Sequence, residues 1–137
     1  MRVVSLLLAI ACSAAFADQT SAPAGAAVYI IKPADRARVK SPVTVVFGLT
    51  GMGIAPAGVK FDNTGHHHLL IDTALPADLT LPLPANDGIR HFGKGQTETT
   101  IDLAPGKHTL QLLFADLTHT PFSPNVASSK ITITVVK

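Results

Sequence analysis

The stretch Gly65-His66-His67-His68-Leu69-Leu70-Ile71-Asp72 joins three consecutive histidines to an apolar triplet and a carboxylate. A short apolar run bounded by turn residues, here Asn63-Thr64-Gly65, is typical of a buried β-strand. Side chains alternate between the two faces of a strand, so His66 and His68 are predicted on one face and His67 on the inward face. The two imidazoles would lie roughly 6.5–7 Å apart along the strand, close enough to share a metal ion. The alternative is a polar strand end whose imidazoles only hydrogen-bond to loops.

Alternating apolar residues continue on both sides of this stretch. Strands are predicted over 28–31, 43–49, 97–103, 108–114 and 131–136, with segments rich in glycine and proline between them. No segment shows the apolar period of an amphipathic helix. This pattern predicts an all-β fold, an immunoglobulin-like antiparallel β-sandwich.

The segment Pro105-Gly106-Lys107-His108 favours the immunoglobulin-like class. In that class a ring often occupies the corner just before the penultimate strand. We therefore interpret His108 as structural. His67 is expected to pack inward with a satisfied hydrogen bond.

Residues 1–17 have the pattern of a secretory signal peptide. Arg2 supplies a positive start, residues 3–11 form a short apolar run, and Ala15-Phe16-Ala17 is an A-x-A cleavage site. Cleavage after Ala17 predicts a periplasmic or secreted protein with a flexible leader over 18–27 and one β-sandwich domain over 28–137. The apolar run is too short for a transmembrane segment. Cys12 loosely resembles a lipoprotein signal, so a lipid-anchored domain is the alternative.

Composition narrows the classes of function. Cleavage would remove the one cysteine, so we expect neither a disulfide nor thiolate chemistry. Removing Arg2 from the 11 Lys and Arg leaves ten against nine Asp and Glu, a net charge of +1. No basic run or aromatic platform indicates nucleic acid. The Gly-x-Ser-x-Gly and His-Glu-x-x-His motifs are missing and Glu98 is the one glutamate, so we do not expect an enzyme.

The six histidines are the compositional anomaly, because all of them lie between His66 and His119. With immunoglobulin-like connectivity, the loops that carry Met52, His91 and His119 and the start of the histidine strand meet at one end of the domain, whereas His108 falls at the opposite end. The residues predicted as metal ligands are His66, His68, His91, His119 and Met52. Asp72 or Asp116 could accept hydrogen bonds that orient the imidazoles.

This ligand set predicts a small exported metal-binding protein. Imidazole suits zinc, copper and nickel, and an added thioether favours copper, especially Cu(I); copper is therefore preferred, with zinc as the alternative. The ordinary histidine pKa of about 6.5 predicts that protons displace the metal between roughly pH 7.5 and pH 5. The competing hypothesis is a non-catalytic immunoglobulin-like interaction module whose histidine rim contacts a protein or glycan partner.

Several motifs together resemble one bacterial family. The most specific are GHHHLLID at 65–72 and HFGKGQT at 91–97. Shorter ones are Phe47-Gly48, Gly51-Met52-Gly53, Pro56-Ala57-Gly58 and the segment 105–112. With Asp116 and His119, they resemble the exported family catalogued as domain of unknown function 4399, over roughly residues 28–136. The resemblance implies a small exported single domain and supplies no activity or ligand, so the metal hypothesis depends on the histidines.

Overall fold

The computed structural model describes residues 18–137, which form two β-sheets and contain no helix. The smaller sheet has the order β1-β3-β7, with β1 at Ala27–Lys32, β3 at Val43–Thr50 and β7 at Glu98–Ile101. The predicted signal peptide and Cys12 lie outside the described residues. Within residues 18–137, no helix is long and apolar enough to cross a membrane.

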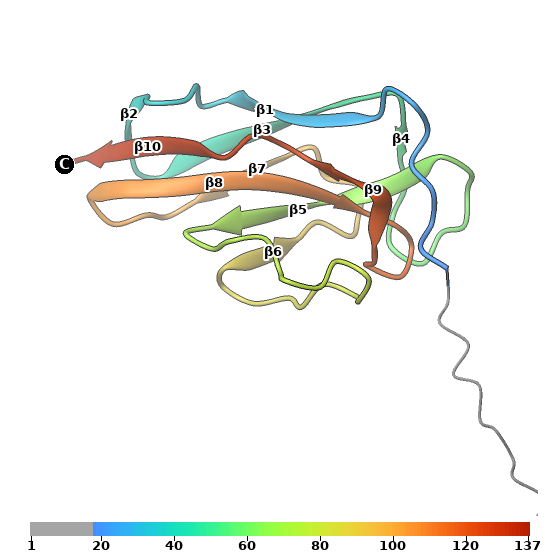
Figure 1. The fold of residues 1–137 in the computed structure, drawn as a ribbon. Helices are drawn as coiled ribbons and strands as arrows, with labels where there is room; N and C mark the ends of the chain where they lie inside the picture. The colour runs from blue at the N-terminus through green and yellow to red at the C-terminus, as the bar shows by residue number, and fades with distance from the viewer. Residues whose placement is uncertain (1–17) are drawn as a thin grey trace, which may run out of the picture.

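The larger sheet has seven strands in the order β2-β10-β8-β5-β4, with β6 also paired to β5 and β9 to β8. Its strands are β2 (Arg38–Lys40), β4 (Gly53–Ile54), β5 (Thr64–Ile71), β6 (Ile89–His91), β8 (Gly106–Ala115), β9 (Pro121–Ala127) and β10 (Ile131–Val136). Figure 1 shows β1 and β3 in one layer and β8 and β5 in the other. This order matches the A-B-E and G-F-C layers of an immunoglobulin sandwich, and the predicted all-β fold is confirmed.

The main core lies between the two sheets. Leu69, Leu110, Leu112 and Phe114 are fully buried there, as the alternation along the histidine strand and along 108–114 predicts. Burying a side chain of this size contributes roughly 1.5–3 kcal/mol relative to exposure. The inner faces of β5 and β8 therefore hold the two layers together.

A second, smaller core covers the outer face of the large sheet. It contains Leu70 of β5 and Leu113 of β8, together with Leu83, Ile89 and Ala115. Leu83 belongs to the long connection 73–88 between β5 and β6, which packs on this face. Small clusters of this kind are common under long loops. The connection thus covers the face of β5 toward which His66 and His68 point.

Four strands do not follow from the sequence pattern. β2 lies in a charged turn region, β4 in a glycine-rich loop and β6 after a proline-rich segment, and two or three residues are too few to show alternation. β9 contains two prolines, which are tolerated because it is an edge strand. Gln111 of β8 lies on the outer face with Leu113 but is buried, and its side-chain amide donates to the Ser128 carbonyl oxygen.

The N-terminal segment is held against β9. The Ser123 amide donates to the Thr20 carbonyl at 2.9 Å, and the Ala22 amide donates to the Ser123 carbonyl at 3.0 Å. The Gln19 side-chain amide donates to the carbonyls of Leu79 and Pro121. The small, polar composition of 18–27 predicts a flexible leader, whereas these partners from distant segments give its first part a defined place.

Candidate metal site

Strand register places three of the four predicted histidine ligands side by side. In β5, His66 lies opposite Ala115 and His68 opposite Leu113 of β8. On the other edge of β5, His91 of β6 lies directly opposite His68. Side chains opposite one another on antiparallel strands have Cβ atoms about 4.5–5.5 Å apart. The sheet itself therefore gathers His66, His68 and His91 on its outer face.

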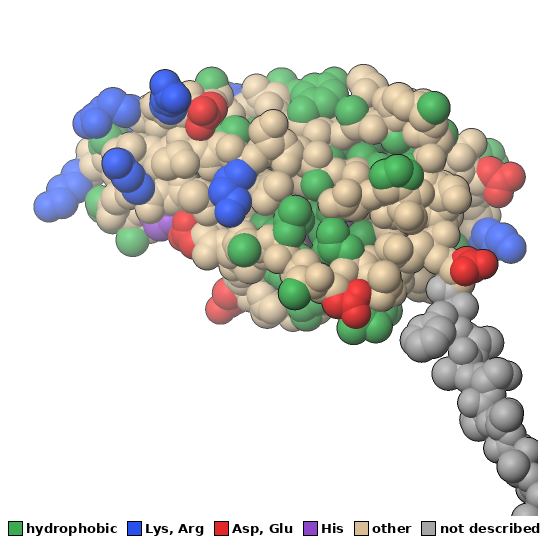
Figure 2. All heavy atoms as spheres, viewed as in Figure 1, with side chains coloured by type: hydrophobic (Ala, Val, Ile, Leu, Met, Phe, Trp, Pro, Cys, Tyr) green, Lys and Arg blue, Asp and Glu red, His purple; other side chains and the backbone are tan. Residues whose placement is uncertain are grey.

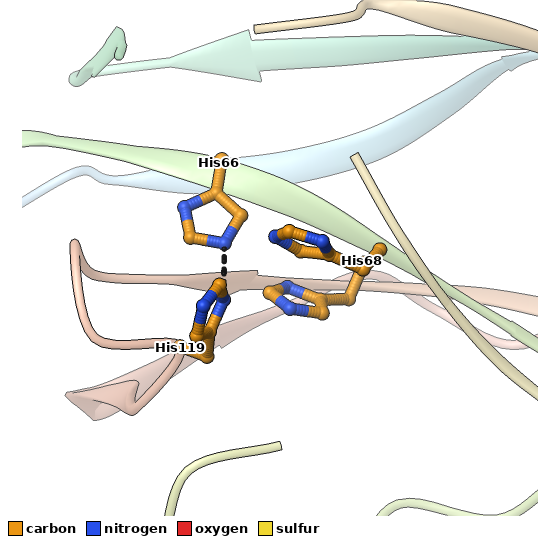
Figure 3. Close-up of side chains that lie close together, drawn as sticks. His66, His68 and His119 are labelled. Atoms are coloured by element: carbon orange, nitrogen blue, oxygen red, sulfur yellow. Dashed lines mark hydrogen bonds between the residues drawn. The ribbon is translucent and has the colours of Figure 1, made fainter. Parts of the chain in front are cut away.

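The fourth histidine comes from the loop between β8 and β9. The ring centroid of His119 lies 4.5 Å from that of His91 and 5.0 Å from that of His66. Figure 3 shows the imidazoles of His66, His68 and His119 turned toward one another. One nitrogen from each of the four rings lies within 4.8 Å of the others. The predicted convergence of His66, His68, His91 and His119 is thus present in the structure.

One hydrogen bond closes the cluster. His66 Nε2 and His119 Nδ1 are 3.0 Å apart, so one of these nitrogens carries the hydrogen and the other accepts it (Figure 3). Three further ring nitrogens of the cluster are buried and have no hydrogen-bond partner among residues 18–137: His66 Nδ1, His68 Nδ1 and His91 Nε2. Leaving a buried polar atom unpaired costs about 1–3 kcal/mol. The fold therefore maintains several nitrogen atoms whose hydrogen-bonding capacity residues 18–137 do not use.

Burial keeps these imidazoles neutral. Desolvation, followed by repulsion from His91 and His119, lowers the pKa of His66 to about 4. Desolvation and the neighbouring imidazoles lower the pKa of His68 to about 3, and the same two causes lower the pKa of His91. Neutral imidazole is the form that binds a metal. Protons would therefore compete with a metal for these nitrogens only at a lower pH than the range of 7.5 to 5 expected from the ordinary histidine pKa.

Two glycines make room for this arrangement. A Cβ atom on Gly93 would lie 2.2 Å from Cε1 and 2.5 Å from Nε2 of His91. A Cβ atom on Gly65 would lie 2.3 Å from the Ala115 carbonyl oxygen, so β5 and β8 approach closely just before His66. In the sequence, Gly93 is identified only as part of the HFGKGQT motif. Its position two residues after a candidate ligand is the signal that could have identified it.

Met52 does not join the histidines. Its side chain packs against the main core, whereas the cluster occupies the opposite, outer face of β5. The prediction of a thioether ligand is therefore corrected. The hydrophobic side chain prefers the apolar interior to a polar site.

His67 points inward as predicted, between the rings of Phe47 and Phe114, each 5.0 Å away. The prediction that His67 makes a hydrogen bond is wrong, because both of its ring nitrogens are buried and unpaired within the described chain. Burial lowers its pKa to about 4. Because side chains alternate along a strand, the His67 ring must enter the apolar core when His66 and His68 face the cluster.

The predicted orienting carboxylates bond elsewhere. Asp72 binds His108 at the far end of β5, and the carboxylate of Asp116 accepts from threonines rather than from an imidazole. His108 places Nδ1 2.7 Å from Asp72 Oδ2 and Nε2 2.7 Å from the Ala104 carbonyl oxygen. A corner ring bonded to backbone a few residues upstream is the structural role predicted for His108.

Comparison with known proteins gives one family. Residues 45–136 match the family described as Domain of unknown function (DUF4399). No curated protein matches the chain, and no solved structure does. The match covers most of the sandwich, including all four clustered histidines, and agrees with the resemblance carried by the GHHHLLID and HFGKGQT motifs. The chain belongs to the family of the domain of unknown function 4399.

Proposed function

We propose that this protein is an exported metal-binding protein that holds one divalent ion with His66, His68, His91 and His119. The observation that carries the proposal is the convergence of four imidazole nitrogens within 4.8 Å. Three buried nitrogens without a partner in the described chain add to it, since a metal would use such atoms. The A-x-A signal sequence supports export.

The donor set favours Cu(II), with Zn(II) next. Imidazole binds both ions, and Cu(II) stands at the top of the affinity order for nitrogen ligands. Because Met52 packs against the main core, no thioether is available to favour Cu(I). Metal–nitrogen bonds of about 2.0–2.1 Å require nitrogens roughly 3–4 Å apart, so small ring rotations would close the present site around an ion.

The same donor set supports a binding role rather than a catalytic one. Catalytic zinc sites keep one position open for water, whereas four protein ligands close a tetrahedral site. The interaction-module alternative requires the histidines to touch a partner. His66 is 0% and His68 1% exposed, so neither ring is available to a protein or glycan surface.

Metal titration of the tag-free chain from Asp18 tests the proposal. We expect Cu(II) to bind more tightly than Zn(II). His66→Ala and His68→Ala should each weaken binding by at least the 10–100-fold typical of lost outer contacts. His108→Ala is the matched control at the far end of the same sheet and should leave affinity unchanged.

Two results would overturn the proposal. Wild-type affinity no tighter than that of a free histidine-rich peptide would remove the metal and leave the interaction module. Loss of binding in His108→Ala but not in His66→Ala would place the site at the wrong end of β5.

A further inference from the structure

The loop that carries His119 takes its shape from one carboxylate. Asp116 Oδ1 accepts hydrogen bonds from the Thr118 amide at 2.9 Å, the Thr118 hydroxyl at 2.8 Å and the Thr120 amide at 3.1 Å. The His119 amide donates to the Asp116 carbonyl at 3.0 Å, and His119 itself has a φ of 67°. A non-glycine residue persists in this left-handed region when its surroundings fix it. Asp116 therefore sets the direction in which His119 leaves the loop.

The other oxygen of this carboxylate binds the N-terminal segment. Thr20 Oγ1 donates to Asp116 Oδ2 at 2.7 Å, across 96 positions of sequence. Asp116 is only 6% exposed, and a buried carboxylate needs its hydrogen bonds satisfied. Thr20 supplies one bond that the 116–120 loop does not make for itself.

We infer that Thr20 is a positioning residue for the metal site, and that segment 19–22 is a clasp that holds His119 in place through Asp116. The inference rests on the proposed metal-binding function. It follows from the chain of contacts Thr20 to Asp116, Asp116 to the loop, and His119 to His66 at 3.0 Å. Coupling between two sites is reciprocal. Metal binding should therefore tighten the docked segment, and release of the segment should weaken the metal.

Two further hydrogen bonds of the 116–120 loop do not involve the Asp116 carboxylate. The Gly58 amide donates to the Leu117 carbonyl and the Leu83 amide donates to the His119 carbonyl, both at the backbone. They hold the loop against two neighbouring connections whether or not Thr20 is present. Removing the Thr20 hydroxyl should thus leave the fold intact and disturb the orientation of His119.

Thr20→Val removes the hydroxyl and keeps the shape of the side chain. We expect about a tenfold loss of Cu(II) affinity, the lower end of the range for residues that orient a metal ligand. Thr20→Ser retains the hydroxyl and should bind within twofold of wild type. Thr44→Val is the matched control, because its hydroxyl lies 3.4 Å from that of Thr100 on the other sheet.

A double-mutant cycle with His119→Ala separates positioning from general weakening. If Thr20 acts through His119, Thr20→Val causes no further loss of Cu(II) affinity in the His119→Ala background. An equal loss in both backgrounds would overturn the inference, as would wild-type affinity in Thr20→Val.

Imidazole NMR of the metal-free chain gives a readout that needs no metal. Thr20→Val should shift the ring signals of His119 and His66 and leave those of His108 unchanged. If wild type binds no metal, the proposed function fails while this spectrum still decides the clasp. Unchanged His119 signals would rule it out.

Discussion

At one end of β5, His66 and His68 face two further imidazoles; at the other end, Asp72 binds His108. His108 has an oxygen acceptor at each ring nitrogen, so it satisfies both only as a protonated ring. The hydrogen bond to Asp72, and then that to Ala104, raise its pKa. Among residues 18–137, no oxygen acceptor is hydrogen-bonded to His66 or His68, and burial lowers the pKa of both rings and keeps them neutral. Surroundings rather than residue type decide whether an imidazole is a cation or a neutral ring.

The two ends also differ in charge. Figure 2 shows lysine and arginine side chains gathered over the end of the sandwich where β2 and the C-terminus lie. This is the end of β8 that carries His108, because the strand pairing continues from His108 and Ile133 toward β2. The histidine cluster lies along the sheet away from these cations, which favours a bound metal ion there.

Metal-dependent stability should show the largest difference between the ends. A ligand at about 1,000 times its Kd stabilises the folded state by about 4 kcal/mol. Denaturant unfolding with Cu(II) should show this gain in wild type and in His108→Gln. The double variant His66→Ala/His68→Ala should show none. An equal gain in that double variant would mean that the ion binds elsewhere.

Acid sensitivity of the metal-free chain comes next. The unfolded chain takes up protons on its histidines near pH 6.5, whereas the pKa of folded His67 is about 4. The unfolded state thus binds more protons between these values, and the free energy of unfolding falls as pH decreases from 6.5 to 4. At 1.36 kcal/mol per pKa unit this is roughly 3 kcal/mol for one ring.

His67→Leu should remove that contribution and the unpaired nitrogens with it. We expect higher stability at pH 7 and a shallower decline toward pH 4 in urea unfolding curves measured at several pH values. A decline as steep as that of wild type would show that His67 is not the titrating group.

Gly93→Ala should have an intermediate effect. The added methyl group collides with the His91 ring and displaces one ligand, so Cu(II) affinity should fall about 10–100-fold. Gly53→Ala is the control, because its nearest contact would be the Thr64 methyl group at 3.2 Å. Equal affinities for the two variants would separate His91 from the site.

The smallest effect is expected at His108, whose partner Asp72 is half exposed. The raised pKa of His108 gives a stabilising contribution that is complete below pH 6.5 and disappears as pH rises through the folded pKa. Burial acts to raise the pKa of Asp72, but the hydrogen bonds from His108 and Thr109 outweigh it and lower that pKa. Its contribution is therefore present above 3.8 and is lost as pH falls through the lowered value.

His108→Gln should cost about 1 kcal/mol or less near pH 5, and less again at pH 9. Thermal unfolding at both pH values measures the difference. A larger loss at pH 9 would contradict the assignment of a protonated ring.

Sequence reasoning succeeds where the pattern is local. Alternation along residues 65–72 places His66 and His68 on one face and His67 on the other, and the apolar period of 108–114 identifies the core. What the sequence could not predict depends on contacts between distant segments. The clasp of Thr20 on Asp116 and the covering of the outer face by residues 73–88 leave no local period. The prediction of Met52 as a ligand follows from its glycine-rich loop, whereas its packing against the main core depends on residues distant in the sequence.

The close approach at Gly65 has a consequence for how this strand can change over generations. A one-residue insertion or deletion that shifted β5 by one position would exchange its two faces, sending two imidazoles into the apolar interior and leaving one outside. It would also bring a side chain against the Ala115 carbonyl oxygen, where a Cβ would lie at 2.3 Å. Both errors would occur together. Changes of length can therefore be absorbed in the turn before β5, but we expect an insertion or deletion within β5 itself to be removed by selection.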